Sequence, residues 1–343
     1  DAIADLLDLH VDAAREAQTP AVKLVHWLIA FQFDGRQDFF QIDPVAYAPA
    51  LGEQGMALYR AKLVEIEAAL PPERPADAPS RFTLSRSDPD AYAREVKASR
   101  ERFQLEHNAR RLAVLDRDVD GIIATHRRGG TAVWLEDTAR ALEEIERSDL
   151  AIEWAGTAAH VDLGRPALTA SEYWCALLGE HRPEALPDAR LEVFRRWPTA
   201  AHATKLVAAS DDWPALEPEV RETLRGVPPE AVLFALTTDP REALDLYDEL
   251  GVRDRAVTEQ LAAALEPVDA ARALPLHRDL VEMDLVKTDT RMYRPAANRL
   301  VRMRKLAEGT ALAGPVDDLI AGLRARYPRR SRMLAEFDRA RLP

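Results

Sequence analysis

The sequence predicts an all-α protein in which stacked helix pairs form an irregular α-solenoid behind a small N-terminal helical domain. Three observations support this fold class. Only 14 of the 343 residues are glycine, alanine and leucine are abundant, and runs of β-branched residues are few, which favours helices over strands. Short segments of the second half place their apolar residues on one helical face. Such segments also recur along the chain at irregular intervals.

The clearest helices lie in the last third of the chain, from Pro228 to the C-terminus. In residues 240–250, Asp239 suits the N-cap and Pro240 the first helical position, and Gly251 ends the helix. Four apolar side chains of this segment share one face: Ala243, Leu244, Tyr247 and Leu250. Because a short helix with one apolar side must bury that side, each of these helices must pack against neighbouring helices.

A weak internal repeat extends this pattern toward the N-terminus. The first helices of successive pairs are expected near residues 131, 168, 198, 229, 253 and 291. Their mean spacing is roughly 32 residues, close to that of a tetratricopeptide-type helix pair, although the individual intervals vary. Four positions of the repeat should be buried between adjacent helices: Ile152, Leu191, Leu244 and Leu276.

Two domains are expected. Residues 1–128 should form the N-terminal helical domain, and residues 129–343 the tetratricopeptide-like helical-repeat domain. The first domain begins with about three helices, of which the third starts at Pro44 and breaks near Gly52. A Pro-rich loop should follow at residues 71–88, since several prolines gather there.

The residue inventory argues against several kinds of site. The single cysteine, Cys175, excludes an intramolecular disulfide framework and a Cys-rich zinc site, and its apolar surroundings predict a buried thiol. The sequence contains no His-x-x-x-His pair, Gly-rich phosphate loop or nucleophile elbow. We therefore expect no metal, no cofactor and no catalytic residue. No apolar run approaches the about 18 residues that a membrane span needs, and we expect a cytoplasmic protein without membrane contact.

One acidic stretch has the residue pattern of the start of a calcium-binding loop. Residues 116–121 alternate aspartates with other residues and end in Gly121. The twelfth position of such a loop must be a bidentate glutamate, but here it is Arg127. The flanking apolar residues keep helical spacing, so we expect a solvated helix face or a junction between helices instead of a cation site.

Charge is distributed unevenly along the chain. The net charge is −12, but residues 1–286 carry −20, and the remainder, from Lys287, carries 14 basic and 6 acidic residues for a net of +8. Seven of these cations form a candidate partner-binding patch: Arg291, Arg294, Arg302, Lys305, Arg326, Arg329 and Arg330. The helical segments that carry them should pack side by side, so that their charges add. Two interpretations stay open: the patch meets phosphate or an acidic partner, or it coats a soluble terminal helix that caps the stack.

The region from Thr131 to Leu342 resembles the tetratricopeptide-like helical region that follows the zinc finger in bacterial SWIM-type proteins of uncharacterised function. The resemblance is carried by residues 147–154, residues 194–199 and the ending from Tyr293 to Arg330. It implies a helical-repeat architecture and no particular activity. The SWIM finger needs Cys-x-Cys and Cys-x-His ligands, and this chain has one cysteine, so the finger's zinc and nucleic-acid binding do not carry over.

These patterns predict a helical-repeat scaffold for protein–protein interaction in a bacterial cytoplasm, and not an enzyme. Stacked helix pairs make extended surfaces that suit a protein or peptide partner. The alternative is association with nucleic acid through the basic C-terminal helices, with weak and sequence-independent binding expected. A third hypothesis, a carboxylate-based enzyme in the N-terminal part, has no motif in its support.

Overall fold

Helices account for 81% of the protein, which confirms the all-α prediction. The computed structural model describes residues 2–34, 42–72, 85–126 and 130–343, and no strand occurs in them. No helix within these ranges is both long enough and apolar enough to cross a membrane.

The chain divides into two compact units, unit 1 (Asp1–His181) and unit 2 (Arg182–Pro343), each with hydrophobic core clusters of its own. The predicted domain boundary between residues 128 and 129 falls outside the described residues and stays a prediction. The predicted Pro-rich loop at 71–88 also lies largely outside them. Of its described residues, 85–87 are helical.

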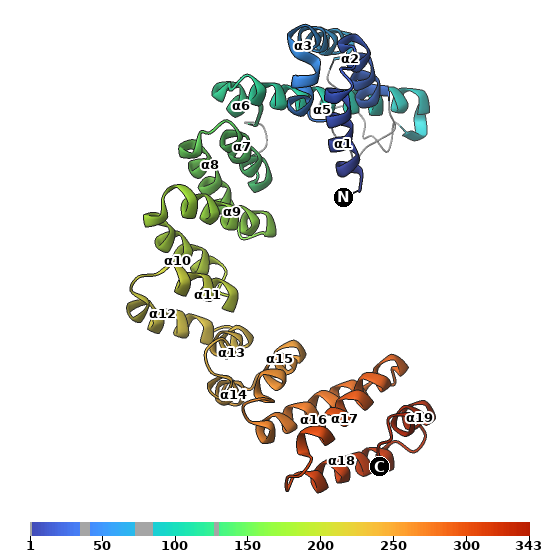
Figure 1. The fold of residues 1–343 in the computed structure, drawn as a ribbon, viewed down its shortest axis with the longest axis vertical. Helices are drawn as coiled ribbons and strands as arrows, with labels where there is room; N and C mark the ends of the chain where they lie inside the picture. Colours follow the sequence, from blue (N-terminus) through green and yellow to red (C-terminus); the bar gives the residue numbers. More distant parts are fainter. Residues whose placement is uncertain (1, 35–41, 73–84, 127–129) are drawn as a thin grey trace. The chain divides into compact units, whose positions relative to one another are not determined.

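Unit 1 is a succession of helices, shown in blue to green in Figure 1. Its elements are α1 (Ala2–Glu16), α2 (Ala21–Ile29), the π-helix η1 (Ala30–Asp34), α3 (Pro44–Ala69), α5 (Pro89–Leu115), α6 (Val119–His126), α7 (Ala132–Glu144), α8 (Ser148–His160) and α9 (Arg165–His181). Asp43 caps α3, because its side chain accepts a hydrogen bond from the Val45 backbone N–H at 3.0 Å. Gly52 confirms the predicted break in α3, with a φ of 59° that glycine adopts readily.

The acidic stretch at 116–121 is a junction between helices, as predicted. Helix α5 ends at Leu115 and α6 begins at Val119. Asp118 Oδ1 accepts a hydrogen bond from the Gly121 backbone N–H at 3.0 Å, and Asp116 Oδ1 accepts one from Arg60 Nη2 at 2.7 Å. Asp118 therefore stabilises the turn between α5 and α6, and Asp116 links this turn to α3.

A buried polar cluster joins η1, α3 and α5 inside unit 1. The Tyr59 hydroxyl lies 2.7 Å from Gln32 Oε1 and 2.6 Å from Asn108 Oδ1. Gln32 Nε2 also donates to Asn108 Oδ1 at 3.2 Å. All three side chains are buried, and buried polar groups are costly unless they are paired. The cluster therefore fixes the register of the three elements against one another.

Unit 2 continues the same helical organisation, shown in yellow-green to red in Figure 1. Its elements are η2 (Pro183–Ala185), α10 (Leu186–Arg196), α11 (Ala200–Ala209), α12 (Trp213–Arg225), α13 (Pro228–Leu236), α14 (Pro240–Glu249), α15 (Arg255–Leu265), α16 (Ala270–Val286), η3 (Thr290–Met292), α17 (Tyr293–Ala307), α18 (Ala313–Arg326) and α19 (Ser331–Arg339). Helices that follow one another in sequence pack against one another, for example α13 on α14 and α15 on α16.

The helix starts lie within three residues of the predicted ones. The six helices begin at Ala132, Arg165, Ala200, Pro228, Arg255 and Tyr293. Ile152, Leu244 and Leu276 are buried as predicted, and so is the Cys175 thiol. Leu191 is only partly buried, because Val193 and Phe194 take the core positions of α10.

Leu244 provides the test of the helix register. Its side chain is 6% exposed and belongs to a core cluster with residues of α13, α15 and α16. Leu244→Ala should lower the free energy of unfolding by about 2–5 kcal/mol, because it removes buried apolar contacts and leaves a cavity. The measurement is urea unfolding followed by circular dichroism.

Val268→Ala in the same unit is the control, since Val268 is 43% exposed. It should change the free energy of unfolding by less than about 0.5 kcal/mol. Equal stability of the two variants would show that the register is wrong.

Candidate partner-binding surface

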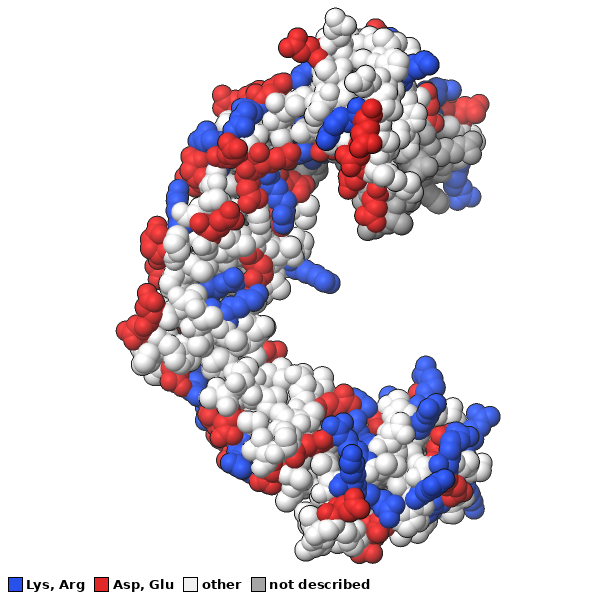
Figure 2. Space-filling view, in the orientation of Figure 1, with Lys and Arg blue, Asp and Glu red and all other residues white. Residues whose placement is uncertain are grey.

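The C-terminal helices of unit 2 bury one face of each helix and leave the other to charged side chains. The core cluster beneath them includes Tyr293, Leu300 and Met303 of α17, together with Ile320 of α18 and Phe337 of α19. Because these positions face inward, most arginines and lysines between them face outward, with Arg299 as a partly buried exception. Figure 2 shows Lys and Arg side chains gathered over these C-terminal helices.

Arg330 ties the connection between α18 and α19 to the end of α16. Its Nη1 donates a hydrogen bond to the Leu285 carbonyl at 2.6 Å, and its guanidinium lies 4.1 Å from the centre of the Tyr327 ring. Leu285 belongs to the last turn of α16, where a cation also complements the helix dipole. Nearby, Arg326 Nη1 lies 4.0 Å from a carboxylate oxygen of Glu282.

Six cations thus belong to the end of α16 and to the segments next to it, and we call this set the basic tip. Its members are Lys287, Arg291, Arg294, Arg326, Arg329 and Arg330. Lys287, Arg294 and Arg329 are exposed, and their side chains make no hydrogen bond or ion pair with any described residue. Arg291 pairs at 3.0 Å with Asp289, two residues away in the chain. The tip therefore carries at least three positive charges that no described residue matches.

Two residues of the predicted patch, Arg302 and Lys305, lie farther along α17. Arg302 follows Arg294 by eight residues, or about 12 Å along a helix. Its Nε and Nη2 donate to Glu266 Oε2 at 2.9 and 2.6 Å, so its charge is matched. Lys305 lines a cavity of about 430 Å³ together with Arg341 and Glu308. The structure thus places five of the seven predicted residues in the basic tip and two near the other end of α17; their role in binding stays a prediction.

An ionic network beneath this surface links α15, α16 and α17. His277 Nε2 lies 2.7 Å from Glu266 Oε1, and His277 Nδ1 lies 3.5 Å from Arg299 Nη1. Arg299 Nη2 donates to Glu259 Oε1 at 3.1 Å. This geometry assigns the ring hydrogen to Nε2, where it faces a carboxylate, and leaves the Nδ1 lone pair facing a guanidinium. Burial lowers the pKa of His277, although the Glu266 carboxylate opposes this shift.

The same network contains the buried carboxylate of Asp284. Arg255 Nη1 donates to Asp284 Oδ1, and Arg255 Nη2 also lies 3.1 Å from Glu259 Oε1. Asp284 and His277 were not identified from the sequence as members of a network. A helical pattern shows which positions share a face, but it does not show which polar residue on that face lies next to a charged residue of another helix. The signal that exists is their place on the apolar side of α16, among Leu280, Val281 and Leu285.

One group in unit 1 has the composition of a metal site. A carboxylate oxygen from each of Glu143 and Glu180 and a ring nitrogen of His181 lie within 4.8 Å of one another. Glu180 and His181 are exposed, and the Tyr173 hydroxyl already donates to Glu143 Oε2 at 2.7 Å. Exposed acidic side chains commonly gather without an ion, so we assign no metal to this group.

Comparison of the chain with known protein families, with curated proteins and with solved structures finds no match. The charges and contacts described above are therefore the basis for a functional proposal.

The lowered pKa of His277 predicts how stability depends on pH. Below the ordinary histidine pKa of about 6.5, the unfolded chain binds a proton that the folded protein resists, so unfolding is favoured. This contribution to stability is complete above about pH 6.5 and declines as the pH falls toward the lower folded-state pKa. Urea unfolding at pH 7.5 and at pH 5.5 measures the free energy of unfolding at each pH. Between these two pH values, this free energy should fall less for His277→Gln than for the wild type.

His26→Gln serves as the control, because His26 is exposed. It should show the same decline as the wild type. If His277→Gln also declined like the wild type, burial of a neutral His277 would be refuted.

Proposed function

We propose that the protein is a helical-repeat scaffold whose basic tip binds an acidic segment of a partner protein. The observation that carries the proposal is the set of exposed cations at the tip, of which Lys287, Arg294 and Arg329 have no partner in the described chain. Charge of one sign, gathered without counter-charge, attracts a partner of the opposite sign. The proposed role is binding, without catalysis.

The proposal includes a tetratricopeptide-like α-solenoid, with the SWIM-type helical region as the family that it resembles. Consecutive packing of helices supports it, as do helix starts close to those expected for pairs. In such an arrangement each helix pair contacts only its neighbours, and the stacked pairs present an extended surface that a partner can bind.

The aromatic side chains near the tip favour a protein partner over single-stranded nucleic acid. Base stacking needs exposed rings, but Tyr293 and Phe337 are buried and Tyr327 is partly covered by Arg330. Val286, next to Lys287, is 71% exposed and offers an apolar contact that a protein segment can use. An acidic peptide with interspersed leucines fits this combination of charge and apolar surface.

Binding at the tip should be moderate and sensitive to salt, because each exposed ion pair contributes only about 0–1 kcal/mol. Fluorescence anisotropy with a labelled 12-residue peptide of glutamate and leucine measures the affinity at 50 and 150 mM salt. Arg294→Glu combined with Arg329→Glu should weaken binding at least tenfold, or about 1.4 kcal/mol. Both side chains are exposed and unpaired, so the fold should tolerate the changes.

The matched control combines Lys23→Glu with Arg94→Glu, two exposed cations of unit 1. It changes the net charge equally and should leave the affinity within a factor of three. Equal weakening by both double variants would mean that the peptide senses only the total charge, and the proposed site would be rejected.

The alternative function is association with nucleic acid through the same cations. Exposed arginines attract polyanions of any sequence, and this attraction falls steeply as salt rises. Titration of labelled DNA and RNA 20-mers at 50 and 150 mM salt compares the two functions. Submicromolar binding that persists at 150 mM salt and is lost in the Arg294/Arg329 double variant would favour nucleic-acid association over binding of an acidic protein segment.

A further inference from the structure

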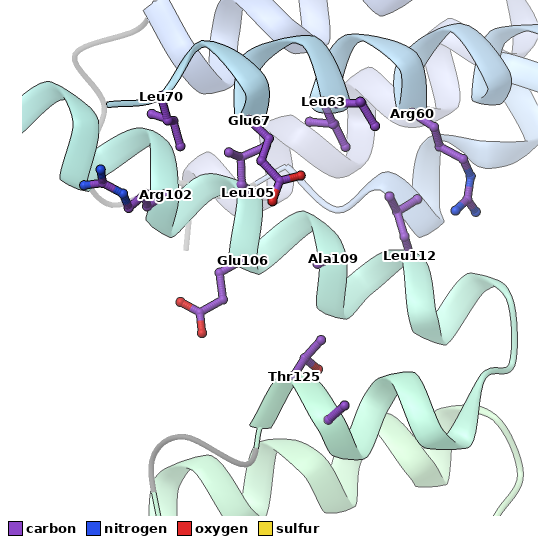
Figure 3. A pocket seen from close by; sticks show the side chains of 12 residues that line it. Arg60, Leu63, Glu67, Leu70, Arg102, Leu105, Glu106, Ala109, Leu112 and Thr125 are labelled. Atoms are coloured by element: carbon purple, nitrogen blue, oxygen red, sulfur yellow. The ribbon is translucent and has the colours of Figure 1, made fainter. Parts of the chain in front are cut away.

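A trough of about 820 Å³ lies on the surface of unit 1, between α3, α5 and α6 (Figure 3). Its floor is apolar, with leucines from α3 and α5 and small side chains from α5 and α6: Leu63, Leu70, Leu105, Ala109, Leu112 and Ala124. Val64 at its edge is 64% exposed. Apolar surface of this kind, rimmed by charged residues, is typical of a binding site.

The two arginines of the trough are already engaged at its ends. Arg60 Nη2 donates to Asp116 Oδ1 at 2.7 Å, and Arg102 Nη2 donates to the carbonyls of Pro71 and Pro72 at 2.5 and 3.2 Å. Figure 3 shows Arg60 and Arg102 at opposite ends of the trough, both directed away from its middle. Asp116 therefore matches the charge of Arg60, whereas Arg102 keeps its positive charge but commits its donors to the protein backbone at one end of the trough.

The two glutamates of the trough have no such partner. The carboxylates of Glu67 and Glu106 make no hydrogen bond or ion pair with any described residue. In Figure 3, Glu67 extends from α3 toward α5, and Glu106 extends from α5 into the open space beside α6. Arg110 is close enough for its pKa to respond to Glu106, but its guanidinium lies over the Trp134 ring, 4.5 Å from the centre. The trough therefore combines an apolar floor with two carboxylates that no described side chain binds directly.

We propose that this trough binds a short basic amphipathic helix of a partner protein. The leucines of such a helix would lie on the floor, and its lysines or arginines would reach Glu67 and Glu106. The floor runs along α5 from Arg102 to Leu112, about 15 Å, which is the length of roughly ten helical residues. The proposal goes beyond the function of the basic tip, since the surface, the unit and the sign of the charge all differ.

The single cysteine makes a local measurement possible. Cys175 is buried, so a cysteine introduced at the exposed Ala109 can be labelled selectively with an environment-sensitive fluorophore. The probe is a 12-residue peptide of leucine and lysine, with leucines at helical spacing on one face. The labelled Ala109→Cys protein should show a saturable change of emission when this peptide is added. A peptide with glutamine in place of leucine should produce no saturable change.

Charge reversal in the trough tests the role of the two glutamates. Glu67→Lys combined with Glu106→Lys, in the labelled protein, should raise the Kd of the leucine–lysine peptide at least tenfold. The matched control is Glu53→Lys combined with Glu153→Lys, two exposed glutamates of unit 1 outside the trough. This control should change the Kd less than threefold. Circular dichroism of each variant establishes that the helices are retained.

Three outcomes would overturn the proposal. Equal loss of affinity in the two double variants would mean that the peptide responds to the total charge of the protein. Binding of the glutamine peptide as tightly as the leucine peptide would show that the apolar floor plays no part. An emission change of the labelled protein that depends on its own concentration, without peptide, would identify a second copy of this chain as the occupant.

Discussion

The structure depends on one constraint, which is that each short helix has a single apolar side that must be buried. A helix of ten to fifteen residues is marginal alone, so its neighbours in the chain supply the surface that covers it. In unit 2 this constraint produces the core around Leu261 and Leu280 and the next one around Leu300 and Ile320. Consecutive packing follows, and so does a continuous outer surface on which charged residues collect.

The arginines of the C-terminal helices divide into two groups according to what lies next to them. Arg255 and Arg299 face carboxylates between packed helices, where a partly buried ion pair resists screening by salt. Arg294 and Arg329 are exposed, and their side chains make no ion pair with any described residue. The same residue type therefore holds helices together in one place and offers a binding charge in the other.

Unmatched charge also marks the surface proposed in unit 1, with the opposite sign. There the arginines are bound to a carboxylate or to backbone carbonyls, and the carboxylates of Glu67 and Glu106 make no hydrogen bond or ion pair with a described residue. Each unit thus presents a surface whose charge the described chain does not neutralise. A scaffold with such surfaces would select an acidic partner segment at one and a basic segment at the other.

The sequence by itself determined the helices and their buried faces. Pro240 behind Asp239 and the apolar positions around Leu244 specify a helix and its register, because these signals act within one turn of the chain. Only the tertiary structure decided which charges remain free. Arg302 and Arg329 belong to the same basic patch predicted from the sequence, yet Arg302 pairs with Glu266, 36 residues away, and the Arg329 side chain pairs with no described residue. The physical reason is that ion pairing depends on distances across packed helices, which no local pattern contains.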